Sequence, residues 1–368
     1  MIASFSRVSR LGALRPTTLA AALILAWTLA PSSASATFSI VAYDSTTQEL
    51  GVAVQSRAFS VGMAVPWAEA GVGAVATQAS TNESFGPKGL ELMRRGKNAA
   101  AALRTLLAAD TGSSHRQVGI VDAKGRSAAH TGKDCNSWAG HRTGPGYSIQ
   151  GNILAGEAVV AGMERAYLDT KGELSQRLLA ALDAAQAAGG DKRGQQSAAI
   201  LVVRPSDEYP EYRTRYVDLR VEDSKEPIRE LKRVFGIFEA QDLAEAHLRY
   251  ADAYEKKGRK ELARVERERV GEALARALAR GENDASNLNG LAWTCATNGV
   301  YLKEALEAAQ RAVALEPQNS GILDTLAEVH FRMGDRDKAI EVESRALALE
   351  PGSNYLTEQL NRFKIGTK

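Results

Sequence analysis

The sequence predicts an α+β domain followed by an all-helical repeat domain. The N-terminal part alternates apolar and polar residues in short runs separated by turns, which is typical of antiparallel strands. Helical segments then appear between further strands, and from about Phe235 onward the pattern is continuously helical and repeats itself. With 368 residues, 44% hydrophobic and 24% charged, the chain is long enough for a core in each of two domains. We therefore divide it into residues 1–36, 37–235 and 236–368.

Residues 1–36 have the composition of a secretory signal peptide. A positively charged start is followed by the short apolar run Leu19–Ala30 and by small residues at positions 34–36. We expect cleavage between Ala36 and Thr37, export to the periplasm or the medium, and no membrane insertion after cleavage. Two alternatives stay open: cleavage after Ala34, which satisfies the same small-residue rule, and retention as a membrane anchor, for which the apolar run is short.

The charge and the cysteine content exclude several classes of function. The net charge is +2, and the three arginines within residues 1–36 account for +3, so the mature chain is near −1 and has no basic block for nucleic acid. Two cysteines, Cys135 and Cys295, are too few for a disulfide framework, and we expect both thiols to be unpaired. Five histidines without paired spacing argue against a metal site. We expect no metal and no cofactor.

The elements of residues 37–235 follow from local periodicity. Runs with a period of two residues predict strands, and runs with a period of about 3.6 predict helices. The expected strands are residues 37–44, 49–56, 71–78, the two arms of a hairpin within 117–132, then 146–154, 196–203 and 215–223. The expected helices are residues 86–96, 98–110, 157–169 and 174–188. Hairpins, a helical pair, and then a strand, helices and strands make an α+β order with mainly antiparallel pairing.

The C-terminal part carries an internal repeat of 34 residues. The segment "KEALEAAQRAVALEP" ends at Pro317 and "DKAIEVESRALALEP" ends at Pro351, so alanines, a leucine and the closing proline recur at that spacing. This period, with small residues where paired helices pack, resembles the tetratricopeptide repeat (TPR). We count two repeats and a degenerate earlier one, "AHLRYADAYEKKGRKELA". The resemblance implies a protein or peptide partner. Because so few repeats rarely stand alone, we expect this tail to pack against the first domain or to self-associate into a homo-oligomer.

Thr37 becomes a candidate nucleophile if cleavage exposes it. An α-amine has a pKa of about 7.7 to 8.0, so near neutral pH it can accept the proton of its own hydroxyl. The expected hairpin, with Thr46 and Thr47 at its centre, places Thr37 opposite Ser56 and next to Arg57. A fixed cation there favours the neutral amine and stabilises a developing alkoxide. The alternative is an ordinary edge strand after a cleavage site.

Thr37 to about Val234 also resembles a known family. The stretches that carry the resemblance are "TFSIVAYD", "GVAVQSRAFSVG", "VPWAEAGVGAVATQ", "GPKGLELMRRG", "QVGIVDAKGRSAAHTGKDC", "WAGHRTGPGYSIQGNILAG" and "QAAGGDKRGQQSAAILVV". They are similar to the "domain of unknown function 1028" family, which is assigned to the N-terminal-nucleophile (Ntn) hydrolases. The resemblance implies a four-layer αββα sandwich and hydrolysis of an amide bond. Relatives often carry lysine or histidine at the position of Arg57, and since arginine does not shuttle protons, we assign Arg57 an electrostatic role.

Two further segments supply candidate site residues. Gly151 and Asn152 can offer a backbone N–H and a side-chain amide to an oxyanion; the alternative for Asn152 is a turn residue that satisfies its own loop. In the glycine-rich loop 189–197, Asp191, Lys192 and Arg193 can orient the nucleophile or bind a substrate carboxylate; the alternative is a solvated turn with a helix cap. The resemblance favours function for Asp191 and Arg193.

Other residues are weaker candidates for the site. Cys135 lies between His130 and His141 in the sequence, which raises a cysteine–histidine alternative, although packing is the commoner role of such a thiol. The aromatic residues Trp67, Trp138 and Tyr147 are expected in the core or at its rim.

Two functions therefore remain. The first is an exported amidohydrolase that cleaves an amide-containing substrate through Thr37. The second is a catalytically inactive scaffold that binds partners through its helical repeats.

Overall fold

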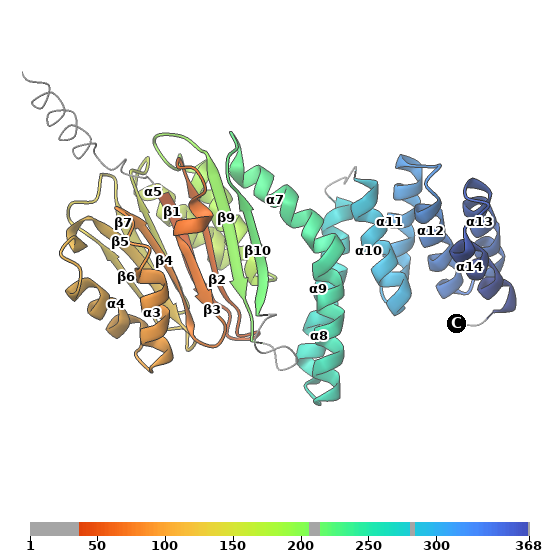
Figure 1. Cartoon of the computed structure of the whole chain (residues 1–368), viewed down its shortest axis with the longest axis horizontal. Helices are drawn as coiled ribbons and strands as arrows, with labels where there is room; N and C mark the ends of the chain where they lie inside the picture. The colour runs from red at the N-terminus through yellow and green to blue at the C-terminus, as the bar shows by residue number, and fades with distance from the viewer. Residues whose placement is uncertain (1–36, 206–213, 280–283, 367–368) are drawn as a thin grey trace, which may run out of the picture.

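The computed structural model describes residues 37–205, 214–279 and 284–366. An N-terminal β-sheet domain is followed by an all-helical C-terminal region (Figure 1). The predicted signal peptide, residues 1–36, lies outside the described residues.

The larger sheet has six antiparallel strands in the order β10-β9-β2-β1-β8-β7. The strands are β1 (Thr37–Tyr43), β2 (Leu50–Ser56), β7 (Gly140–Gly144), β8 (Tyr147–Asn152), β9 (Ser197–Val203) and β10 (Arg215–Val221). Strand β1 lies inside the sheet and is buried on both faces, because apolar side chains occupy both sets of its alternating positions. Asp44 N–H donates to Glu49 O across the turn between β1 and β2. The first residue of β1 therefore lies at the opposite end of the sheet from this turn.

The smaller sheet has four antiparallel strands in the order β3-β4-β5-β6. They are β3 (Pro66–Glu69), β4 (Gly73–Ala79), β5 (Arg116–Asp122) and β6 (Ser127–Thr131). The two sheets pack face to face through a common apolar cluster to which Val41 and Val54 contribute from one sheet and Ala76 and Val121 from the other. Each of these strands thus points alternate residues into the space between the sheets.

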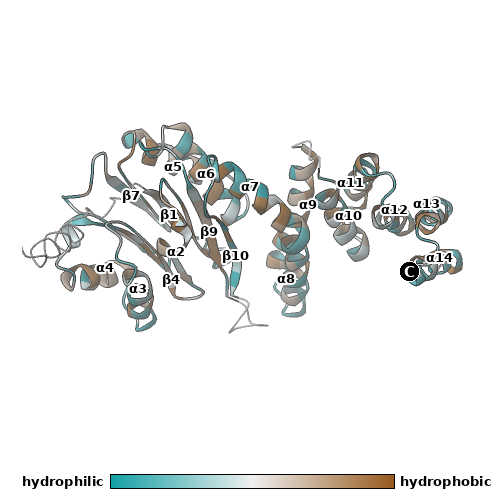
Figure 2. Ribbon diagram, turned by 45° about the horizontal axis from the view of Figure 1, so that its top comes forward, coloured by the Kyte–Doolittle hydropathy of each residue, from teal (hydrophilic) through white to brown (hydrophobic). Residues whose placement is uncertain are grey.

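Helices cover the outer face of each sheet (Figures 1 and 2). Helices α5 (Glu157–Asp169) and α6 (Leu174–Ala187) pack on the six-stranded sheet, and α3 (Phe85–Arg94) and α4 (Ala99–Ala108) pack on the four-stranded sheet. Two short elements, α2 (Val61–Ala64) and the 3₁₀ turn η1 (Ser113–His115), lie in connections. The buried face of α6 shows how the sequence drives this packing, since Leu174, Leu178 and Leu182 lie four residues apart and are fully buried.

The helical region begins with one continuous helical run. It consists of α7 (Pro227–Phe238), the π-helical segment η2 (Glu239–Leu243) and α8 (Ala244–Lys256). The chain then forms α9 (Lys260–Ala279), α10 (Ala285–Asn298), α11 (Leu302–Leu315), α12 (Ser320–Met333), α13 (Arg336–Leu349) and α14 (Asn354–Ile365). The expected boundary between residues 235 and 236 thus falls inside α7. The repeated alanines of α11 and α13, such as Ala305 and Ala339, are fully buried where the paired helices approach.

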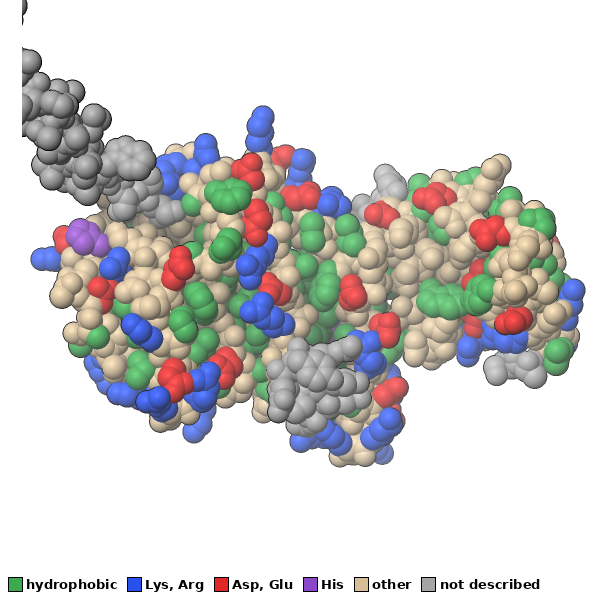
Figure 3. All heavy atoms as spheres, in the orientation of Figure 1, with side chains coloured by type: hydrophobic (Ala, Val, Ile, Leu, Met, Phe, Trp, Pro, Cys, Tyr) green, Lys and Arg blue, Asp and Glu red, His purple; other side chains and the backbone are tan. Residues whose placement is uncertain are grey.

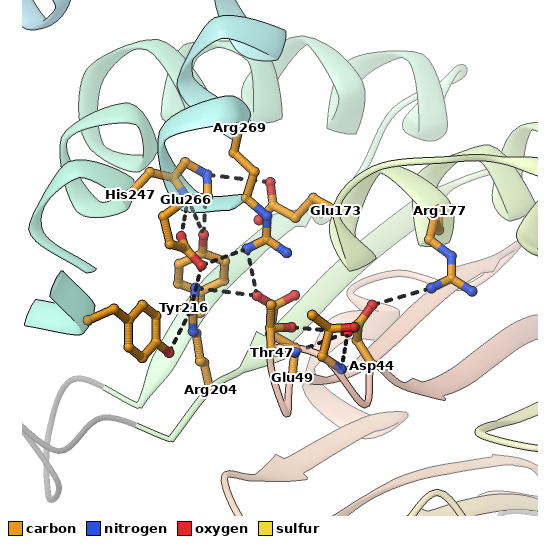
Figure 4. Close-up of polar contacts among 12 residues, drawn as sticks. Asp44, Thr47, Glu49, Glu173, Arg177, Arg204, Tyr216, His247, Glu266 and Arg269 are labelled. Carbon is orange, nitrogen blue, oxygen red and sulfur yellow. Dashed lines mark hydrogen bonds and ion pairs between the residues drawn. The ribbon is translucent and has the colours of Figure 1, made fainter. Parts of the chain in front are cut away.

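A cluster of buried charged side chains joins the helical region to the sheet domain (Figure 4). It comprises Glu49, Glu173 and Arg204 from the sheet domain and His247, Glu266 and Arg269 from α8 and α9, none of them more than 6% exposed. Arg204 Nη2 donates to Glu266 Oε1 at 2.6 Å, and Arg269 Nη1 donates to Glu49 Oε1 at 3.0 Å. The expected packing of the helical tail against the first domain is therefore confirmed for α8 and α9.

The electrostatics of the cluster favour charged groups in spite of burial. Burial lowers the pKa of His247, but its contacts with Glu173 and Glu266 outweigh this and raise that pKa above its ordinary value. Burial raises the pKa of Glu266, and the hydrogen bond from His247 and the charge of Arg204 bring it down to about 2. Glu49 is the exception, because burial outweighs the charges of Arg269 and Arg204 and raises its pKa. With His247 protonated, three cations face three acidic side chains.

Most elements match the expectations from sequence, and the misses are short or polar. The expected strands and helices of the sheet domain are all present, with ends shifted by a few residues. Strands β3 and β7, the short helix α2 and the part of α7 before residue 235 were not expected. Strand β7, "GHRTG", carries no apolar alternation, and it exists because β8 supplies its partners.

Candidate functional site

Thr37 is the first residue of β1 and lies between two polar side chains on neighbouring strands. It pairs with Ser56 of β2 and with Asn152 of β8. The Oγ atoms of Thr37 and Ser56 are 3.1 Å apart and hydrogen bonded. The expected register of the hairpin is confirmed. The pairing of Asn152 with Thr37 was not predicted from the sequence. All three residues are buried in the full-length chain.

The space between the sheets is apolar at one end and polar at the end that holds Thr37. Alternation places Thr37, Ser39 and Val41 on the same face of β1, and only the last of these is apolar. From the four-stranded sheet, Gln78 and Gln117 enter this layer and are fully buried. We call the polar end of the layer, with Thr37, Ser39, Ser56, Gln78, Gln117, Ser148, Gln150 and Asn152, the polar layer.

Gln78 connects the smaller sheet to Thr37. Its Nε2 donates to Thr37 O at 3.1 Å and to Gln117 Oε1 at 2.8 Å. Its Oε1 accepts a hydrogen bond from Ser39 Oγ at 2.6 Å. The backbone of the candidate nucleophile is therefore fixed by a side chain from the opposite sheet.

Gln117 connects the same network to Asn152. Its Oε1 accepts from Asn152 Nδ2 at 3.1 Å, and its Nε2 donates to Gly151 O at 2.8 Å. Sequence reasoning did not single out these glutamines. The sequence signal was a glutamine at a position of a predicted strand that alternation directs inward. A polar group buried there must find a hydrogen-bond partner.

Gly151 has a packing role in this structure. A Cβ atom at this position would lie 2.3 Å from Leu154 Cδ1, so the buried Leu154 side chain would have to move to admit any other residue. Its carbonyl is engaged by Gln117, and the residue pairs with Phe38 of β1. Asn152 is the member of the pair that faces Thr37 between the sheets.

The loop with Asp191 is tied to the end of β2. Asp191 Oδ2 accepts from Arg57 N at 2.9 Å, and its carboxylate also binds the Arg193 guanidinium, with Nη2 at 3.0 Å from Oδ2. Within the part of the chain that the structure describes, the hydrogen bonds of the Asp191 side chain go to these two residues, so it positions the backbone next to Ser56.

Arg57 directs its charge to the solvent side of this loop. Its side chain is exposed, and Nη1 donates to Gln196 Oε1 at 2.9 Å. Gln196 is neutral, and its amide also donates from Nε2 to Asp223 Oδ1 at 3.0 Å, so an acidic side chain lies beyond it. Arg57 thus keeps a positive charge one residue after Ser56, as the electrostatic role requires.

Cys135 does not form a pair with either histidine. Its Sγ contacts Arg116 O at 3.4 Å, whereas His130 binds Ser113 O and His141 binds Thr131 Oγ1. Burial raises the pKa of the Cys135 thiol, which makes it a poorer nucleophile. Both cysteines are free, as expected.

The three aromatic candidates lie in the core or at its edge. Tyr147 is buried and donates from its hydroxyl to Glu164 at 2.8 Å, and Trp67 and Trp138 are partly buried.

Within the described ranges, no cluster of three or more acidic, histidine or cysteine side chains has the geometry of a metal site. In the same ranges, no helix combines the length and apolar character needed to cross a bilayer. Acidic and basic side chains are intermingled on the face shown in Figure 3.

Three solved structures are similar to parts of this chain. The chain is similar to protein SPO2555 from Silicibacter pomeroyi, a DUF1028 crystal structure, with 30% identity, a TM-score of 0.52, and coverage of 57% of this chain and 92% of that one. It is also similar to the first and second TPR domains of human RPAP3, with 16% and 20% identity, TM-scores of 0.24, and coverage of 33% of this chain and 91% and 94% of those domains. No curated protein matches the chain significantly.

The family model described as "Family of unknown function (DUF1028)" matches residues 37–231, which is more than half of the chain and begins at the candidate nucleophile. The chain belongs to the DUF1028 family.

Proposed function

We propose that this protein is an exported hydrolase of the N-terminal-nucleophile type. Thr37 would be its nucleophile, the α-amine of Thr37 its base, and an amide its substrate. The observation that carries the proposal is the position of Thr37, which opens β1, bonds to Ser56 and faces Asn152 inside a polar layer between two sheets. The order helices, sheet, sheet, helices supports it, since the Ntn resemblance implies that arrangement.

The proposed reaction needs only groups at this site. Thr37 Oγ1 attacks the amide carbonyl carbon while the α-amine accepts the hydroxyl proton. As the tetrahedral intermediate collapses and its C–N bond breaks, the protonated α-amine donates this proton to the leaving amine, and a threonyl ester remains. Water then attacks the ester with the same amine as base and releases the acid, so that one amide and one water give one acid and one amine.

Neighbouring side chains have separate proposed roles. The Asn152 amide has two N–H groups and donates one of them to Gln117, so the other can bind the oxyanion. Ser56 orients the Thr37 hydroxyl, and Arg57 lowers the pKa of the nearby amine through its charge. Gln78 fixes the carbonyl of Thr37 and thereby the start of β1.

A second function is binding without catalysis. The repeated hairpins α10–α11 and α12–α13 favour it, because stacked helical pairs present an extended surface to a partner. In that case the sheet domain would support the helical region, and the buried charged cluster would hold the two together.

N-terminal sequencing and intact mass of the exported protein test the first requirement. We expect the mature chain to begin at Thr37. A start at Ser35 or an unprocessed chain would eliminate the amine base, since an extra residue converts the amine into an amide.

Substitution of the hydroxyl then separates the two functions. Release of free amine from a panel of amides is measured by mass spectrometry, for the wild type, Thr37→Ala, Thr37→Ser and the exposed control Thr357→Ala. We expect Thr37→Ala to abolish turnover, Thr37→Ser to retain part of it, and Thr357→Ala to match the wild type. Turnover by Thr37→Ala at the wild-type rate would refute the mechanism, and unchanged capture of a partner by an inactive wild type would favour the scaffold.

A further inference from the structure

Two large apolar side chains are exposed in the segment that follows β2, the strand that carries Ser56. Phe59 is 69% exposed and Met63 is 67% exposed. Both follow the end of β2, and Phe59 is three residues beyond Ser56, so the Cα atoms of these two residues are at most about 11 Å apart. Helix α2, which carries Met63, contacts β2 and β9 (Figure 2). We call Phe59 and Met63 the apolar pair.

The backbone that carries the apolar pair is fixed at several points. A mobile loop makes few hydrogen bonds to the rest of the molecule, whereas this segment makes several. The anchoring hydrogen bonds are Arg57 N to Asp191 Oδ2 at 2.9 Å, Ser197 Oγ to Ala58 O at 2.6 Å, Ser60 N to Glu222 O at 3.0 Å and Val61 N to Ser197 Oγ at 3.0 Å. Phe59 is thus displayed by a rigid segment that is bonded to both neighbouring loops.

The same segment holds a strained residue. Ser60 has φ 57° and ψ 44°, a left-handed conformation that is unfavourable for a side chain other than glycine. Such conformations persist where surrounding contacts fix them, and they concentrate at functional sites. The strain is present at the point where the chain turns to expose Phe59.

We propose that the apolar pair receives an aryl or alkyl group of the amide that Thr37 cleaves. This inference rests on the proposed function. Continuity with the site supports it, because the segment that carries the apolar pair begins at the residue whose hydroxyl bonds to Thr37. Two side chains also provide far less surface than the roughly 800 Å² per partner of a stable protein interface, so a substrate group is a better occupant than a second copy of the chain.

The charge of the site narrows the substrate class. Arg57 lies between Ser56 and Phe59 in the chain, and its guanidinium bonds to the neutral Gln196. A cationic substrate group would be repelled by this exposed positive charge. The expected substrates are therefore amides with an apolar group near the scissile bond and without a positive charge beside it.

Covalent probes test this preference without the natural substrate. Mature protein that starts at Thr37 is treated with β-lactones that carry a phenethyl, a butyl or an aminoethyl substituent. Thr37 Oγ1 attacks the lactone carbonyl, the ring C–O bond breaks, the ring oxygen takes up the hydroxyl proton, and an ester adduct with the full mass of the probe forms. The rate of this adduct at Thr37 is measured by peptide mass spectrometry.

We expect the phenethyl probe to react about tenfold faster than the aminoethyl probe, as partial burial of an aryl group predicts. Phe59→Ser with Met63→Ser should lower the phenethyl rate severalfold, so that only the part of the advantage caused by Arg57 remains, and should leave the aminoethyl rate within about twofold. Phe59→Leu, which keeps an apolar surface, should retain most of it. Leu168→Ser, which replaces a residue that is 50% exposed on α5, serves as the control and should change neither rate.

Two results would overturn the inference while leaving the nucleophile intact. One is equal reaction of all probes with Thr37 in the wild type, and the other is a phenethyl rate that the double substitution leaves unchanged. Sedimentation velocity tests whether a second copy of the chain covers the apolar pair instead. A dimer that dissociates on the double substitution, with an unchanged probe preference, would assign the apolar pair to a contact between two copies. Absence of any Thr37 adduct would instead refute the proposed function, and the inference would fall with it.

Discussion

Removal of the Arg204 side chain tests how the buried charged cluster stabilises the molecule. Arg204 is fully buried, bonds to Glu266 at 2.6 Å and to the Tyr254 hydroxyl at 2.9 Å, and lies 4.1 Å from the ring centre of Tyr250. Arg204→Met keeps much of the apolar volume and removes the charge. Three buried acidic side chains then face two cations, Arg269 and His247.

The expected cost is about 3 to 5 kcal/mol of the free energy of unfolding, which is the usual loss when one partner of a buried ion pair is removed. With a urea dependence of about 3 kcal/mol per M for a chain of this size, the midpoint should fall by roughly 1 to 1.5 M. Tryptophan fluorescence reports both parts of the molecule, because Trp67 and Trp138 lie in the sheet domain and Trp293 lies in α10. Single-tryptophan variants should show the helical region unfolding first.

A matched control lies on α9. Arg264 is 55% exposed at its side chain and pairs with Glu261 and Glu268 on the same helix. Arg264→Met should change the free energy of unfolding by less than about 1 kcal/mol, as for other exposed pairs. If Arg204→Met cost no more than Arg264→Met, the argument that the buried cluster holds the helical region to the sheet domain would be wrong.

Two further predictions concern other buried polar groups. Burial and the neighbouring Asp324 raise the pKa of Glu343 to about 8, so the folded protein keeps a proton that the unfolded chain releases, and stability should fall as the pH rises from about 5 to 9. Glu343→Gln should match the wild type near pH 5 and exceed it by about 1 to 2 kcal/mol at pH 9 in urea titrations; an identical slope in both proteins would contradict this. Gln117→Leu leaves buried partners such as Gly151 O unsatisfied and should cost about 3 to 5 kcal/mol, seen as a fall of about 6 to 15 °C in Tm, whereas the exposed Gln318→Leu should change little.

Local sequence patterns were sufficient to predict the elements whose contact partners lie close to them in the sequence. The alternation in residues 37–56 and the polar turn between its arms predicted the register that joins Thr37 to Ser56. The 34-residue period predicted helices α10 to α13. In both cases the partners are close in sequence, so periodicity and turn chemistry determine which residues meet.

The candidate site needed contacts between distant segments. Asn152 is 115 positions after Thr37, and only the pairing of β1 with β8 brings it alongside. Gln78 belongs to the other sheet, and its bond to Thr37 O exists because the two sheets stack. No local sequence pattern predicts that Asn152 and Gln78 lie beside Thr37. A glutamine in a strand can bond to any polar partner that the fold brings near it, so its position in the sequence does not identify that partner.

The sequence by itself determined the α+β and helical parts, the hairpin that begins at Thr37, the repeat, and the family resemblance. Only the tertiary structure decided that a polar layer surrounds Thr37, that Asp191 holds the backbone of Arg57, and that charged groups are buried between the sheet domain and α8 and α9. The physical reason is that burial of a polar or charged group is tolerated only when its partners arrive together. Those partners come from separate segments that the whole fold must first assemble.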